Sequence, residues 1–220
     1  MQKLIFNIMM EFSRKEVRDL LIALVVLSFS FAIASVGIDA HGIISIFPIV
    51  VVGVATGFIL REIGQKFVAM KCGCEAEFKL WPIGLLIAFA TAFIGMVFAF
   101  PGEIRTFPGQ ITDEINGKVG IAGPLANMML ALIFIVIAAL IYPFSLHSII
   151  LHLIFLICTV GFSVNSFLAA FNLLPIYSLD GIKVLKWDAK IWIVVFAIAV
   201  IMMLSSITIG AENMVELLIG

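Results

Sequence analysis

The sequence predicts an all-α polytopic membrane protein, with about six hydrophobic segments and a small re-entrant or β region between the second and the fourth. Hydrophobic residues make up 63% of the 220 residues and charged residues only 12%, whereas a soluble domain carries about 25% charged residues. Long stretches without charge alternate with short clusters of Lys and Arg. The 13 basic residues are balanced by 14 acidic ones, so no basic surface for nucleic acid is expected.

Charge-free stretches locate the membrane segments, because a bilayer core of about 30 Å needs about 20 apolar residues in a helix. The stretches are Leu20–Ile38, Gly42–Leu60, Leu80–Gly102, Val119–Leu179 and Ile191–Ala211. Tyr142-Pro143 interrupts the fourth stretch and divides it into two helices, which makes six segments. We assign them to one membrane domain over 1–220, composed of an amphipathic stretch and first span (1–42), a core (43–190), and a last span with a tail (191–220).

The start of the first helix and its orientation can also be predicted. Ser13 followed by Glu16 is a capping box, which marks a helix that enters the membrane soon afterwards. Lys and Arg favour the cytoplasmic side of a cell membrane. By this rule the N-terminus and the loops containing Lys79 and Lys186 are cytoplasmic, whereas the loop at Pro143 and the C-terminal tail lie outside.

This orientation requires one apolar segment that does not cross the membrane. Two segments separate Lys79 from Pro143, and two crossings would return the chain to the cytoplasmic side. We therefore expect 82–100 to re-enter, or to form a hairpin in the cytoplasmic half and wall a cavity there. Glu103–Phe107 and, more weakly, Glu75–Leu80 alternate polar with apolar residues, which predicts a small sheet on that side.

Three groups of polar residues lie at membrane depth, where an ionisable side chain suggests a functional site. The first is Arg61-Glu62-Ile63-Gly64-Gln65, inside one predicted helix from Ile43 to Met70. The alternative is that Arg61 and Glu62 only mark the end of the span. Apolar residues continue the pattern beyond the pair, which favours a site.

The second and third groups surround prolines. Asn172-Leu173-Leu174-Pro175 leads to Asp180-Gly181, and Asn165 lies seven residues before Asn172, on the same helix face. Gly123-Pro124-Leu125-Ala126-Asn127 has proline where the first turn of a helix accepts it, so a helix is expected to start there.

Together these groups resemble the site-2 protease family of intramembrane zinc metalloproteases, and in particular its small archaeal members. The similarity covers Ile43 to Lys186, and its most specific part is Asn-Leu-Leu-Pro-Ile-x-x-Leu-Asp-Gly. In that family two histidines of a His-Glu-x-x-His helix and a distal aspartate bind zinc, and the glutamate is the general base. The resemblance places these roles at positions 61, 65, 180 and 62, and a re-entrant β region between the first two motifs.

This sequence departs from the family at both histidines, which are Arg61 and Gln65. A guanidinium offers no lone pair to a metal, and a glutamine carbonyl is a weak zinc ligand. We therefore expect no zinc cofactor, with Glu62 as a vestigial general base. We expect Arg61 to bridge Glu62 and Asp180 in place of the metal, with Gln65 donating amide hydrogen bonds, because two buried carboxylates without a cation would be costly.

The resemblance also suggests residues that line a substrate groove. These are Asn127, Asn165, Asn172, Gly123 and Pro175. The expected partners are the lipid bilayer and transmembrane helices of other membrane proteins. The oligomeric state is left open.

Other metal sites have weak sequence support. Cys72 and Cys74 form an isolated Cys-x-Cys pair, which is poor evidence for a metal. His41 and His147 fall in loops on the outer side, and His152 lies within a helix, where we expect it to hydrogen-bond a neighbour. None of the three is expected to reach Glu62 from the cytoplasmic side.

Three functions are compatible with the sequence. The first is a pseudoprotease that binds transmembrane helices without cutting them. The second is an active intramembrane metalloendopeptidase with an atypical site, against which the loss of both imidazoles argues. The third is an ion, proton or solute transporter. Charged groups at half depth and a broken helix are also typical of that class, although no inverted repeat is visible.

Overall fold

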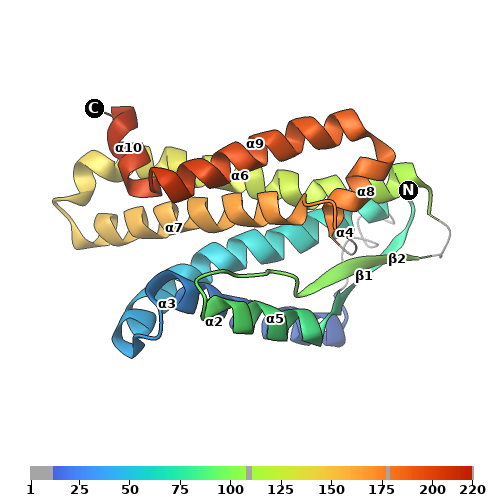
Figure 1. Ribbon diagram of the computed structural model, residues 1–220, viewed down its shortest axis with the longest axis horizontal. Helices are drawn as coiled ribbons and strands as arrows, with labels where there is room; N and C mark the ends of the chain where they lie inside the picture. Colours follow the sequence, from blue (N-terminus) through green and yellow to red (C-terminus); the bar gives the residue numbers. More distant parts are fainter. Residues whose placement is uncertain (1–11, 108–110, 177–178, 220) are drawn as a thin grey trace, which may run out of the picture.

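The computed structural model describes residues 12–107, 111–176 and 179–219, and most of them are helical (Figure 1). Five helical segments are long and apolar enough to cross a membrane, which confirms the predicted fold class. They are Arg14–Val36, Ala40–Lys71, Asp113–Ser145, Ile149–Asn172 and Ala189–Thr208. Most of the predicted N-terminal amphipathic stretch and residues 177–178 of the Asn172–Gly181 motif lie outside the described residues.

The first span is helix α2 (Arg14–Val36), and its predicted capping box is present. The Ser13 backbone N–H donates to Glu16 Oε2 at 2.9 Å, and the Glu16 backbone N–H donates to Ser13 Oγ at 3.1 Å. These bonds satisfy two of the donors that a helix start leaves without partners. The capping box therefore sets where α2 begins, six residues before the charge-free stretch that starts at Leu20.

The second span is one continuous helical rod made of three pieces. Helix α3 (Ala40–Val54) continues into the π-helix η1 (Ala55–Ile59), which continues into α4 (Leu60–Lys71). The predicted helix over Ile43–Met70 is therefore found, and a π-helical turn precedes the charged residues. Such turns are frequent at functional sites.

The re-entrant segment is the short helix α5 (Pro82–Ala92), and it does not span the membrane. Its 11 residues extend about 16 Å, roughly half of a bilayer core. The chain then returns alongside it (Figure 1), and the backbone N–H of Trp81 donates to the carbonyl of Pro101 at 2.8 Å. This is the hairpin that the parity of the spans predicts.

The hairpin begins and ends in a two-stranded antiparallel sheet. Strand β1 (Glu75–Leu80) pairs with β2 (Gly102–Phe107), with Glu75 opposite Phe107 and Leu80 opposite Gly102. Both predicted strands are thus present. The sheet lies at the same end of the molecule as the start of α2, and it closes the base of the hairpin (Figure 1).

Helix α6 (Asp113–Ser145) corrects two details of the sequence interpretation. The predicted helix start at Pro124 is wrong, because the helix begins 11 residues earlier, where the Thr112 hydroxyl caps the Ile115 N–H. The predicted boundary at Tyr142-Pro143 also falls too early, since Pro143 lies inside the last turn of α6. Two helices are nevertheless found, because α7 (Ile149–Asn172) starts after a turn capped by Ser148.

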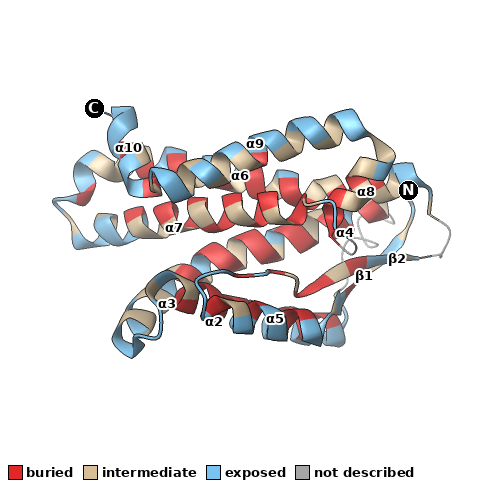
Figure 2. Ribbon diagram, viewed as in Figure 1, coloured by how far each residue is buried: buried red, intermediate tan, exposed pale blue. Residues whose placement is uncertain are grey.

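The remaining helices complete the topology. Helix α8 (Asp180–Trp187) and α9 (Ala189–Thr208) follow α7, and the chain continues into α10 (Ala211–Ile219). Burial concentrates on α7, α4 and the inner face of α2, whereas α9 is largely exposed (Figure 2). The start of α2, the sheet and α8 lie at one end of the molecule, and α10 lies at the other (Figure 1).

Candidate functional site

The polar residues of the second span lie at the start of α4 and are buried. Arg61, Glu62 and Gln65 retain 5%, 0% and 1% of their exposure. Arg61 and Gln65 are four residues apart and therefore share a helix face. Across from them lie Asn172, the last residue of α7, and Asp180, the first residue of α8. The site thus joins three helices that are distant in the sequence.

Arg61 is the centre of this site. Its guanidinium makes ion pairs with Glu62 and Asp180 through separate nitrogens. The nitrogen that contacts Asp180 also donates to Asn172 Oδ1 at 3.0 Å. Asn172 is held in turn by its own side-chain N–H, which donates to the carbonyl of Leu168 at 2.7 Å. The guanidinium therefore lies between the two carboxylates, as expected from the sequence.

Asp180 receives two further donors. The Gln65 amide donates to its Oδ2 at 2.7 Å, and Lys183 donates to its Oδ1 at 3.2 Å. Burial favours the neutral acid, but the charges of Arg61 and Lys183, with the hydrogen bonds from Lys183 and Gln65, hold the pKa of Asp180 below its ordinary value. Two cations thus balance two carboxylates, and the network is neutral as a whole.

Gly123 allows α6 to approach this network. A Cβ atom at Gly123 would lie 2.8 Å from Nε2 of Gln65 and 2.9 Å from Cγ of Arg61. One turn earlier, a Cβ atom at Gly120 would lie 3.2 Å from the backbone oxygen of Asp180. Glycine at these positions therefore leaves space for the side chains of α4 and for the start of α8. Gly123 acts here as a packing residue beside Arg61 and Gln65.

The three predicted groove asparagines lie in the interior. Asn165 donates to the carbonyl of Gly161 at 2.8 Å, and its Oδ1 lies close to Gly57 of η1. Asn127 is fully buried, and neither of its side-chain polar atoms has a partner among the described residues. Pro175 is exposed in the connection between α7 and α8. None of these residues lines the two cavities described below.

The donor set does not fit a zinc ion. Zinc sites in proteins use Cys, His and carboxylate donors with free lone pairs. Here the space between Glu62 and Asp180 is taken by a guanidinium, which has none to offer. Across the described ranges, no group of three His, Cys, Asp or Glu side chains could hold a metal.

The other cysteines and histidines lie away from this network. Cys72 and Cys74 belong to the turn between α4 and β1, where Cys74 Sγ lies 4.0 Å from the carbonyl of Cys72. His147 is exposed in the turn between α6 and α7, as expected. The expected loop position of His41 is wrong, because this exposed residue lies in the first turn of α3. The ring of His152 stacks on Phe155 with centroids 6.5 Å apart.

Two buried or partly buried ion pairs near the site are not predicted from the sequence. Lys183 is only a basic flanking residue in the sequence, although its spacing of three from Asp180 is a signal for a helical ion pair. The second is a buried ion pair between Glu16 and Lys66, at 2.8 Å, with the backbone N–H of Phe78 donating to the same carboxylate oxygen at 2.9 Å. This pair connects α2, α4 and β1.

Comparison with known proteins gives a relative for most of the chain. The chain is 36% identical over 185 residues to a protein of Methanocaldococcus jannaschii named "Putative zinc metalloprotease", a match that covers 84% of this chain and 90% of the relative. The chain belongs to a zinc metalloprotease-like family. No family profile matches this metalloprotease-like chain, and no solved structure matches it.

The match includes the whole of the candidate site. A stretch of 185 residues in a chain of 220 must contain residues 36–185, wherever it begins. Arg61, Asn172 and Asp180 of the metalloprotease-like chain therefore all lie in the region shared with the relative. The likeness extends over the membrane core that carries the network.

Proposed function

We propose that this metalloprotease-like membrane protein is a site-2-type pseudoprotease, which has lost zinc and proteolytic activity and binds transmembrane helices of other proteins. The observation that carries the proposal is the position of the Arg61 guanidinium between Glu62 and Asp180. In the family that the sequence resembles, the equivalent place between these positions holds zinc. Here the positive charge of the side chain takes over the role of the metal charge.

The kept and changed residues together support this reading. Positions 61, 65 and 180 meet in space although they belong to α4 and α8, so the packing that a metal site would need is retained. Catalysis by such a site needs a metal that activates water and polarises the carbonyl. Without it, Glu62 has no activated water to deprotonate, and its carboxylate is instead paired with Arg61.

The proposal includes an orientation in the cell membrane. Apart from Arg61, every described Lys and Arg lies toward the end of the molecule that carries the sheet and α8 (Figure 1). The opposite end carries Asp39, Glu212 and Glu216. Since basic residues favour the cytoplasmic side, the start of α2 and the network lie toward the cytoplasm. Modification of cysteines introduced at Asp39 and Glu114, by an impermeant thiol reagent on intact cells, tests this: labelling at Asp39→Cys alone is expected.

The metal content of the purified chain in detergent tests the loss of zinc. We expect no stoichiometric zinc in the native chain, and about one zinc per chain in an Arg61→His/Gln65→His variant, which supplies two imidazoles opposite Asp180. Glu114→His/Lys118→His is the matched control, because it places the same i, i+4 pair on an exposed face of α6. Stoichiometric zinc in the native chain would overturn the proposal. Zinc in none of the proteins would contradict the resemblance around Asp180.

Two activity assays separate this proposal from the other functions. Cleavage of a transmembrane substrate in proteoliposomes, lost on Glu62→Gln, would establish an active protease. Proton or ion flux through the same vesicles, lost on Asp180→Asn, would establish a transporter. The pseudoprotease proposal expects neither signal above that of empty vesicles.

Helix binding is tested at α9, whose only buried described residue is Ala199. A photo-crosslinking amino acid at Ile201, which is 64% exposed, is expected to capture a membrane polypeptide in native membranes. The same probe at Ile149, which is 83% exposed beyond the turn after α6, is the control and should capture none. Equal capture at both positions would contradict specific binding at α9.

A further inference from the structure

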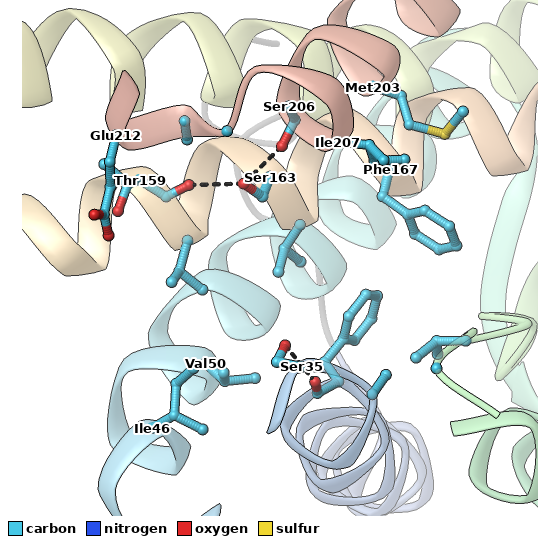
Figure 3. A pocket seen from close by; sticks show the side chains of 18 of the residues that line it. Ser35, Ile46, Val50, Thr159, Ser163, Phe167, Met203, Ser206, Ile207 and Glu212 are labelled. Carbon is cyan, nitrogen blue, oxygen red and sulfur yellow. Dashed lines mark hydrogen bonds between the residues drawn. The ribbon is translucent and has the colours of Figure 1, made fainter. Parts of the chain in front are cut away.

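A groove of about 670 Å³ lies in the half of the molecule away from the Arg61 network. Figure 3 shows that side chains of α2 and α3, such as Ser35 and Val50, form one wall. Side chains of α7 and α9, such as Ser163 and Ile207, form the other wall, and Glu212 of α10 lies at one end. The groove therefore lies where four of the spans, α10 and the segment after α5 leave space between them.

The groove continues into a second cavity that is lined entirely by apolar side chains. This cavity has a volume of about 210 Å³ and shares Met96, Val97, Phe167 and Met203 with the groove. It extends along α7 toward Leu174, on the side of the Arg61 network. The combined space is thus long, narrow and apolar at its inner end.

The outer end of the groove is polar, and its hydroxyl groups already use their protons within the protein. Ser206 donates to Ser163 at 2.7 Å, and Ser163 donates to the carbonyl of Thr159 at 3.0 Å. These hydroxyl groups can therefore accept hydrogen bonds from an occupant of the groove. Glu212 adds a carboxylate, for which no donor is found among the described residues.

The size of the groove argues against a transmembrane helix as its occupant. A helix about 10 Å wide that rises 5.4 Å per turn fills about 420 Å³ per turn. A groove of about 670 Å³ could not enclose two such turns, so a helix would lie across its opening and leave the inner cavity unfilled. A hydrocarbon chain is narrow enough to follow both cavities along α7.

We propose that this groove binds a membrane lipid whose chain lies along α7 and whose head group carries N–H or O–H donors and no net negative charge. The acceptors at Ser163 and Glu212 fit such a head group. An anionic head group would be repelled, since the described residues at this end include Asp39, Glu212 and Glu216 but no Lys or Arg (Figure 1). This site is independent of whether the chain binds zinc or cuts substrates.

Native mass spectrometry of the full chain in detergent tests the head-group preference. The probes are dioleoyl phosphatidylethanolamine, phosphatidylcholine and phosphatidylglycerol, which share chains and differ in donors and net charge. We expect retention of phosphatidylethanolamine to exceed that of both others by about two- to fivefold, the factor that one partly exposed charged contact gives. Equal retention of all three, or a preference for phosphatidylglycerol, would overturn the head-group assignment.

Glu212→Gln assigns the preference to the carboxylate. We expect this variant to reduce the preference for phosphatidylethanolamine to nearly one. Glu216→Gln is the matched control, because it lies on the same helix, outside the groove, where it accepts a hydrogen bond from Tyr142 at 2.9 Å. A preference that survives Glu212→Gln, or that is lost equally in both variants, would contradict the proposed role of Glu212.

A bulky side chain tests the groove itself. Val160→Trp introduces a large ring at a residue that lines the groove, and it is expected to abolish retention of all three lipids. Leu153→Trp, on the exposed face of the same helix, is expected to retain them. Retention that is unchanged by Val160→Trp would overturn the proposal. A polypeptide found in place of lipid, and lost in the same variant, would overturn it in favour of a helix.

Discussion

Arg61 makes an ion pair with Asp180, 119 positions later in the sequence, and this contact connects α4 directly to α8. Both residues are nearly fully buried, so the contact is made without water as a competing partner. In a low-dielectric interior, the removal of one partner leaves a charge that nothing else compensates. The contact therefore acts as a cross-link on which the neighbouring helices depend.

Removal of the Arg61 charge should be strongly destabilising. Arg61→Met leaves Glu62 and Asp180 buried near each other without their shared cation, and it should lower the free energy of unfolding by about 3–5 kcal/mol. Thermal unfolding of the purified chain in detergent measures the change. Arg105→Met is the control, because its pair with Glu103 on β2 is half exposed and should contribute less than about 1 kcal/mol. Equal melting of both variants and the native chain would refute the cross-link.

A double-mutant cycle isolates the contact itself. Arg61→Met and Asp180→Leu should each destabilise, whereas the double variant should lose less than the sum by about 1–3 kcal/mol, because it leaves neither Arg61 nor Asp180 behind without the other. The four proteins are compared by the same unfolding measurement. Additive losses would mean that the two side chains contribute through other partners.

Gly123 should tolerate no side chain. Gly123→Ala places a Cβ atom 2.8 Å from Gln65 Nε2, so the network must shift, at a cost of about 1–3 kcal/mol. Gly64→Ala is the matched control on α4, where the nearest atom, the Ala126 Cβ, would be 3.8 Å away. That variant should be neutral or slightly stabilising, since alanine favours helix. Equal unfolding temperatures for the two variants would show that α6 does not pack tightly here.

The Glu16–Lys66 pair should hold the hairpin base to the bundle. Glu16→Gln removes the carboxylate charge that accepts from Lys66 and from the Phe78 backbone N–H, and we expect a loss of about 1.5–3 kcal/mol, together with faster proteolysis between β1 and β2. Glu114→Gln is the control, because its pair with Lys118 is exposed on α6 and screened by water, so this variant should unfold like the native chain. Unchanged protease resistance in Glu16→Gln would contradict this anchoring role.

Local signals in the sequence predict much of this fold. The capping box at Ser13 and the proline at the first position of α5 each mark a helix start. The hairpin around α5 follows from counting crossings between basic clusters, which depends only on charge and length. The predicted helix start at Pro124 is wrong because proline occurs both at helix starts and inside long apolar helices. The Thr112 cap is the stronger start signal here.

The long-range polar contacts are harder to predict. The contact between Arg61 and Asp180 could be predicted only from the family resemblance, because neither local sequence indicates the other residue as a partner. Glu16 and Lys66 are 50 residues apart, and each resembles an ordinary charge at the end of a span. Their pairing depends on how α2, α4 and β1 pack, which local patterns do not encode.

The π-helical turn at Ala55–Ile59 has a consequence for the angular phase of the second span. Each residue advances an α-helix by about 100°, and a π turn holds one residue more than an α turn. The turn therefore lets Gly53 face Gly161 of α7 while Arg61 faces α8. A chain that lost one residue from this turn would keep Arg61, Glu62 and Gln65. Their side chains, however, would point about 100° away from Asp180.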